Sequence, residues 1–117
     1  PHHLKNKSNC TLESFCEMTA KTADLIGHKH IGIGSDLCIG HPNSVVEWMR
    51  NGKWTKTKDY GEGTSSDASF PKQPCWFEDA RGFKNLELGL KKAGFQDVEV
   101  NGILGNNWYN FYRGIKT

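Results

Sequence analysis

With 117 residues, this chain is long enough for one domain at most. Its formal charge is only +2 and its lysines are scattered, which argues against a nucleic-acid partner. Only 36% of the residues are hydrophobic, and no run of them is long enough to cross a bilayer or to form a signal peptide at the start. We therefore expect a cytoplasmic protein that binds neither nucleic acid nor membrane. Because the chain begins at Pro1, we expect a processed product or a fragment of a longer reading frame.

The four cysteines do not form a metal or redox motif. None is spaced as C-x-x-C, so neither a zinc ribbon nor a thioredoxin-type site is expected. Without an export signal we interpret them as reduced thiols, with a disulfide framework as the alternative. The cysteines are Cys10, Cys16, Cys38 and Cys75.

A helix is predicted after the polar residues 1–10. Thr11 is suited to cap it, Glu13 favours the positive end of its dipole, and Gly27 ends it. Apolar and small side chains recur at helical spacing along one face, and these are Leu12, Phe15, Cys16, Thr19, Ala23 and Ile26.

The stretch from His30 to Asp36 (His-Ile-Gly-Ile-Gly-Ser-Asp) predicts a buried parallel strand. Ile31 and Ile33 favour a strand, and the glycines between them let a neighbouring group approach closely. Such strands carry functional groups at their carboxyl ends, so Asp36 is the candidate catalytic residue. The alternative is an aspartate that caps a helix or a turn.

Residues 37–76 are predicted to be a long functional loop at the active face. Pro42 and Asn43 are suited to start a short helix through Met49, and the rest has no consistent period. The aromatic residues of the loop indicate that it packs against another part of the protein instead of remaining in solvent. Trp48, Trp54 and Tyr60 are the candidate substrate-binding residues. Disorder of this loop is the alternative.

Residues 77–117 are predicted to be helical. One helix runs over residues 84–93 and stops at Gly94, and its interior Gly89 requires close packing to offset a cost of about 1 kcal/mol. A second helix runs over residues 97–113, and the Gly105-Asn106-Asn107 step is expected to break or bend it.

Histidines do not predict a metal site with Asp36. His28 and His30 enter the predicted strand at its amino end, about 15–20 Å from Asp36 in an extended chain. His2 and His3 are a more plausible pair of ligands, as part of a loop at the active face, although adjacent histidines are more often simply exposed. A small metal module of His2, His3, His41 and the cysteines is the least favoured hypothesis. We therefore assign no metal ligand in this chain.

Four stretches in order resemble the renal (membrane) dipeptidase family. They are Thr11-Leu followed by Ala23-Asp-Leu-Ile-Gly, the His30–Asp36 motif, Lys84-Asn-Leu86 followed by Gly94-Phe95, and Ile103-Leu-Gly-Asn-Asn-Trp108. The family's stretches read roughly T-L, H-V-G-I-G-S-D-F-D-G, P-N-L with a later G-[FY], and I-L-G-G-N-[FW]. The resemblance spans nearly all of this chain but only the last third of a family member.

The resemblance implies an α/β fold, a partial (β/α)8 TIM-type barrel completed by oligomerisation. It implies the carboxyl-terminal portion of a zinc-dependent hydrolase that cleaves dipeptides or small amides, whose metal ligands lie upstream of Pro1. Asp36 would bind the substrate's amino group and transfer a proton, and the isolated chain would hold no zinc and be inactive.

Three features depart from the family pattern. Cys38 replaces the second aspartate of S-D-F-D-G, Asn110 replaces an arginine that many members have, and the loop after Asp36 is long. The alternative function is a stand-alone, non-catalytic domain of the same ancestry that binds a small ligand or a peptide.

Overall fold

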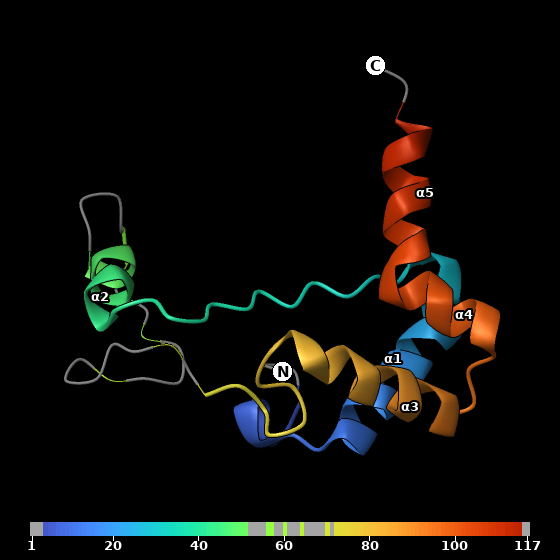
Figure 1. Ribbon diagram of the computed structural model, residues 1–117, viewed down its shortest axis with the longest axis horizontal. Helices are drawn as coiled ribbons and strands as arrows, with labels where there is room; N and C mark the ends of the chain where they lie inside the picture. The colour runs from blue at the N-terminus through green and yellow to red at the C-terminus, as the bar shows by residue number, and fades with distance from the viewer. Residues whose placement is uncertain are drawn as a thin grey trace.

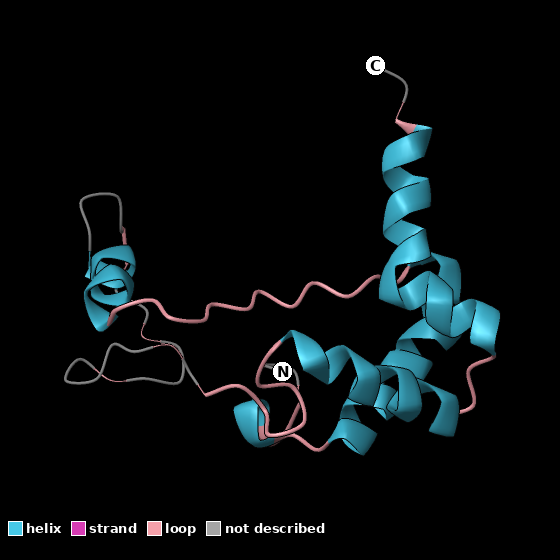
Figure 2. Ribbon diagram, viewed as in Figure 1, coloured by secondary structure: helices cyan, strands magenta, loops and turns pink. Residues whose placement is uncertain are grey.

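The computed structural model describes residues 4–51, 56–57, 60, 64, 70 and 72–115. Over these ranges the chain forms helices and irregular segments but no β-strand (Figure 2). The predicted α/β fold, a partial TIM-type barrel, is therefore wrong. In this part of the chain no helix is both long and apolar enough to span a bilayer.

The error lies in residues 30–36. His28–His30 form a 3-10 turn (η2), and the chain then runs on without regular structure through Gly40. Ile31 is extended, as its β-branched side chain favours, but a strand also requires a second strand beside it. The backbone N–H of Ile33 instead donates to the carbonyl of Ile103, which belongs to a helical segment, over 3.2 Å.

The first predicted helix is confirmed as α1 (Leu12–Ile26), which follows a short 3-10 turn at Lys7–Asn9 (η1). The Thr11 hydroxyl accepts a hydrogen bond from the Ser14 N–H at 3.1 Å, as a capping residue does. Gly27 ends the helix with a φ of +83°, a conformation that glycine adopts without strain. Both ends of α1 are therefore set by local sequence.

The core lies where α1 packs against α3 (Phe83–Lys92) and the following helical segment (Figure 1). Its centre consists of Cys16, Leu90, Val100 and Ile103. Gly89 is buried at the crossing of α1 and α3, where a Cβ would lie 2.8 Å from the Cys16 sulfur. The close packing expected at Gly89 is thus confirmed.

The last helical segment is bent where the sequence predicts it. It consists of α4 (Asp97–Asn101), a π-helical turn (η4, Gly102–Asn106) and α5 (Asn107–Gly114). Gly105 leaves the helical conformation, with φ 179° and ψ −39°. Beyond this break, α5 extends away from the other helices (Figure 1), and its aromatic side chains are exposed.

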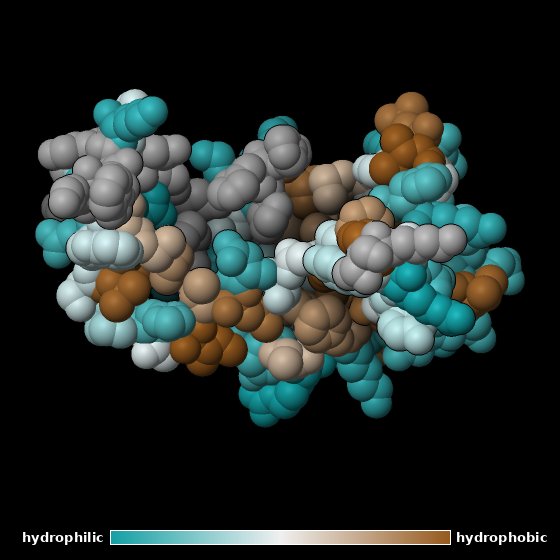
Figure 3. Space-filling model, turned by 90° about the horizontal axis from the view of Figure 1, so that it is seen from above, coloured by the Kyte–Doolittle hydropathy of each residue, from teal (hydrophilic) through white to brown (hydrophobic). Residues whose placement is uncertain are grey.

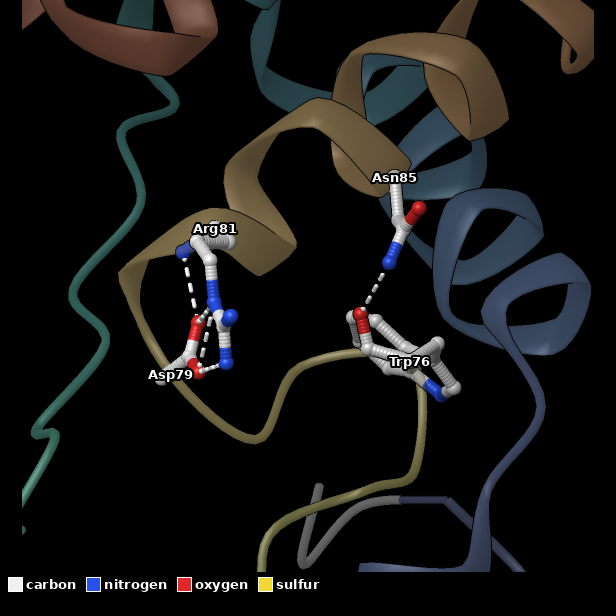
Figure 4. A network of polar contacts seen from close by, with 4 residues as sticks. All are labelled: Trp76, Asp79, Arg81 and Asn85. Atoms are coloured by element: carbon white, nitrogen blue, oxygen red, sulfur yellow. Dashed lines mark hydrogen bonds and ion pairs between the residues drawn. The ribbon is translucent and has the colours of Figure 1, made fainter.

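The segment before α3 straps the amino-terminal residues to that helix. The Trp76 indole donates to the Cys10 carbonyl at 2.8 Å, and its ring lies 5.3 Å from that of Phe15. Asn85 of α3 donates to the Trp76 carbonyl at 2.8 Å, and Asp79 pairs with Arg81 in the turn at Ala80–Gly82 (η3) (Figure 4). We call residues 74–82 the strap.

The short helix predicted from Asn43 is confirmed as α2 (Asn43–Asn51), which lies apart from the other helices at the end of the extended segment (Figure 1). The Cα radius of gyration is 16.5 Å, against about 13 Å for a compact domain of this length. Hydrophobic side chains lie in several separate patches on the surface (Figure 3). The described residues therefore form one small core with an outlying helix.

Candidate functional site

Asp36 lies in the extended segment between the core and α2. Its side chain is exposed, and within the described residues it makes no hydrogen bond or ion pair. Its φ is +47°, in the left-handed region, where aspartate is enriched among the few non-glycine residues found there. Asp36 does not lie at the carboxyl end of a strand, so that reason for expecting a catalytic role no longer holds. It does have an unusual backbone conformation of the kind that clusters at functional sites.

The predicted substrate-binding aromatics do not surround Asp36. Trp48 lies on α2 with its side chain 64% exposed. The Tyr60 hydroxyl donates to the Asn51 side-chain oxygen at 3.1 Å, which joins Tyr60 to the end of α2. Trp54 lies outside the described residues. In the part of the chain that the structure describes, no hydrogen bond or ring contact joins Trp48 or Tyr60 to Asp36.

The structure offers no place for a metal among the residues it describes. No three side chains from His, Cys, Asp and Glu group closely enough there to hold an ion. The Nε2 atom of His28 lies 3.6 Å from a carboxylate oxygen of Glu99, and no disulfide joins any two of the four cysteines, all of which lie within the described residues. His2 and His3 lie outside the described residues.

The structure joins the second and last motifs of the resemblance directly. The Asn107 amide donates to the carbonyls of His28 and Ile31 at 2.8 and 2.7 Å. The Trp108 indole donates to the carbonyl of Ile33 at 3.1 Å. A Cβ at Gly32 would overlap the Trp108 ring, so this position requires glycine. We call these contacts the Asn107–Trp108 clamp.

The clamp was only partly foreseeable. The glycines of the His30–Asp36 motif predict that a neighbouring group approaches closely, and Gly32 confirms this. Nothing in the sequence identifies Asn107 as the residue that holds the two segments together, because the Gly105-Asn106-Asn107 step also predicts a simple helix break.

A comparison of the chain with known protein families, with curated proteins and with solved structures finds no match.

Proposed function

We propose that this chain supplies the carboxyl-terminal portion of a metal-dependent, dipeptidase-like hydrolase that cleaves a peptide or amide bond. The ordered set of sequence motifs carries the proposal. The contacts of the Asn107–Trp108 clamp support it, because they join two stretches of the resemblance that are more than 60 residues apart in the sequence. Two segments that contact each other in the fold are expected to keep their sequence motifs together.

In this proposal Asp36 acts on the substrate. A carboxylate is suited to pair with the ammonium group of a dipeptide or to accept a proton during bond cleavage. Its exposed side chain and left-handed backbone support a role beyond packing. Zinc, in the family that the chain resembles, polarises the scissile carbonyl and supplies the attacking hydroxide. No step is assigned to a metal held by the described residues, among which no three ligand-type side chains gather.

The first test uses the chain as it is. We expect purified residues 1–117 to hydrolyse no member of a dipeptide panel, with or without added zinc, since no group of side chains among the described residues could hold a metal ion. Ninhydrin detection of released amino acids would measure this. Zinc-dependent turnover that survives repurification would contradict the assignment of the metal ligands to another part of the protein.

The second test concerns the residues encoded before Pro1. We expect an H-x-D motif and further metal-binding histidines there, and zinc-dependent dipeptidase activity when that portion is expressed together with this chain. In that enzyme Asp36→Asn should lower kcat by about 10²- to 10⁴-fold, the range for loss of a general acid or base. Asp24→Asn, at an exposed aspartate of α1, is the matched control and should leave kcat unchanged. Absence of upstream metal ligands would refute the proposal.

The alternative is the stand-alone binding domain. It requires a compact monomer, and a radius of gyration of 16.5 Å does not favour that. Light scattering combined with thermal melting separates the two, because a monomer with a sharp transition supports the binding domain.

A further inference from the structure

A hollow lies between the η2 turn and the start of α5, beside the clamp. It has a volume of about 540 Å³, within the range of about 300–1,000 Å³ that small-molecule sites occupy. Lys29, His30, Ile31 and Gly32 line one side, and Trp108 and Phe111 line the other. Asp36, the residue of the proposed hydrolase function, is not among the lining residues.

The aromatic wall is held in place. The hydrogen bond from the Trp108 indole to the Ile33 carbonyl fixes the ring over Gly32. Phe111 stands edge-on to Trp108 with ring centroids 6.2 Å apart, and Tyr112 stacks on Trp108 at 6.0 Å. A ligand ring therefore meets the Trp108 ring, whose position is set by its hydrogen bond, with Phe111 beside it, and this reduces the entropy lost on binding.

Lys29 gives the hollow a positive charge, and His30 lies beside it. Lys29 and His30 are exposed, and within the described residues neither makes an ion pair or a hydrogen bond through its side chain. No aspartate or glutamate lines the hollow. The ammonium group of Lys29 is thus available to a negative group on a ligand, with His30 able to donate a further hydrogen bond.

We propose that this hollow binds a planar aromatic anion of small size, such as an aromatic carboxylate. The ligand's ring packs against Trp108 and Phe111, and its carboxylate pairs with Lys29. This site is separate from the proposed hydrolase function and does not depend on it.

Three probes of similar shape and different charge test the proposal. They are indole-3-acetate, the neutral indole-3-acetamide and the cationic tryptamine. Binding is followed in the intact chain by NMR through the indole N–H signal of Trp108, which is assigned with Trp108→Phe. We expect indole-3-acetate to shift this signal at the lowest concentration and tryptamine at the highest. Equal affinities for the three probes, or shifts confined to other indole signals, would overturn the proposal.

Two variants separate the charged and aromatic parts of the site. Lys29→Gln should weaken indole-3-acetate about two- to five-fold, the effect of one exposed ion pair, and leave indole-3-acetamide unchanged. Lys84→Gln, at an exposed lysine on α3, is the matched control and should change neither probe. Gly32→Ala should displace the Trp108 ring and weaken both probes, and circular dichroism shows whether the helices are retained. An equal effect of Lys29→Gln and Lys84→Gln would refute the assigned role of Lys29.

Discussion

At the scale of single residues, the buried thiol of Cys16 links folding to alkaline pH. Burial raises its pKa from the ordinary 9.0 to about 11, because the thiolate would lose its hydration in the core. The folded chain thus holds this proton more tightly than the unfolded chain. The stability gained is fully present below pH 9 and is lost as the pH rises through the folded-state pKa of about 11.

We expect the free energy of unfolding in urea to fall more steeply between pH 9 and 11 in the wild type than in Cys16→Ala. Cys75→Ala, at an exposed free cysteine, is the control and should keep the wild-type slope. The same slope in Cys16→Ala and the wild type would contradict this.

A second prediction for single residues concerns the effect of Gly89 on stability. Alanine would gain about 1 kcal/mol of helix propensity, but its methyl group would press on the Cys16 sulfur and on Leu12. Overpacking of a core costs about 1–3 kcal/mol, so Gly89→Ala should be destabilising by up to about 2 kcal/mol in urea unfolding. Gly114→Ala, where a Cβ meets nothing within 4 Å, should be neutral or slightly stabilising. If Gly89→Ala matched or exceeded the wild type, the close helix crossing would be wrong.

Single residues were also the most predictable part of the fold. Thr11, Gly27, Gly94 and Gly105 each act through the backbone next to them, and the structure confirms the cap, the two stops and the break. Their effect depends on no distant partner. Asn107 could not be identified in this way, because its amide bonds to carbonyls 76 and 79 residues away.

At the scale of elements, local sequence periodicity predicted the helices correctly. The local preference of residues 30–36 for an extended backbone did not produce the predicted strand. Residues 84–93 and 97–113 repeat apolar side chains at helical spacing, and each forms helix within one residue of the predicted bounds. Ile31 and Ile33 favour an extended backbone, which the segment has, but a strand exists only as part of a sheet. The sequence therefore predicted the extended backbone of this segment correctly, but it did not predict which part of the chain the segment contacts.

The Asn107–Trp108 clamp is expected to contribute to the stability of the fold. Asn107→Ala removes two hydrogen bonds to part-buried backbone carbonyls, and should lower the free energy of unfolding by about 1–3 kcal/mol. Asn110→Ala, at an exposed residue of the same helix, should change it by less than about 0.5 kcal/mol. Urea titrations of both variants would measure this, and equal effects would show that the clamp contributes nothing.

At the scale of the whole molecule, the described chain leaves much apolar surface uncovered. Large side chains such as Leu25, Trp48, Val98 and Tyr112 are 64% exposed or more. Tyr112 contacts Trp108 and Phe111, which are also exposed, and such an exposed cluster of apolar side chains marks an association surface. The barrel predicted from the resemblance would have needed upstream strands, and no pattern within these 117 residues provides them.

We expect the isolated chain to self-associate. Sedimentation velocity should show the weight-average mass rising with protein concentration, and added sulfate should strengthen association, because it favours burial of apolar surface. A single species of monomer mass at all concentrations would contradict this and would favour the stand-alone domain.

The strap also gives the protein an optical marker of its own. Trp76 is part-buried, ring-packed on Phe15 and hydrogen-bonded to Cys10, whereas Trp48 and Trp108 face solvent to a greater extent. Its fluorescence therefore comes from a less polar setting than theirs, and detachment of the amino-terminal residues would shift that emission to the red. Undocking of the strap and melting of the helices thus carry separate spectroscopic signatures in the same molecule.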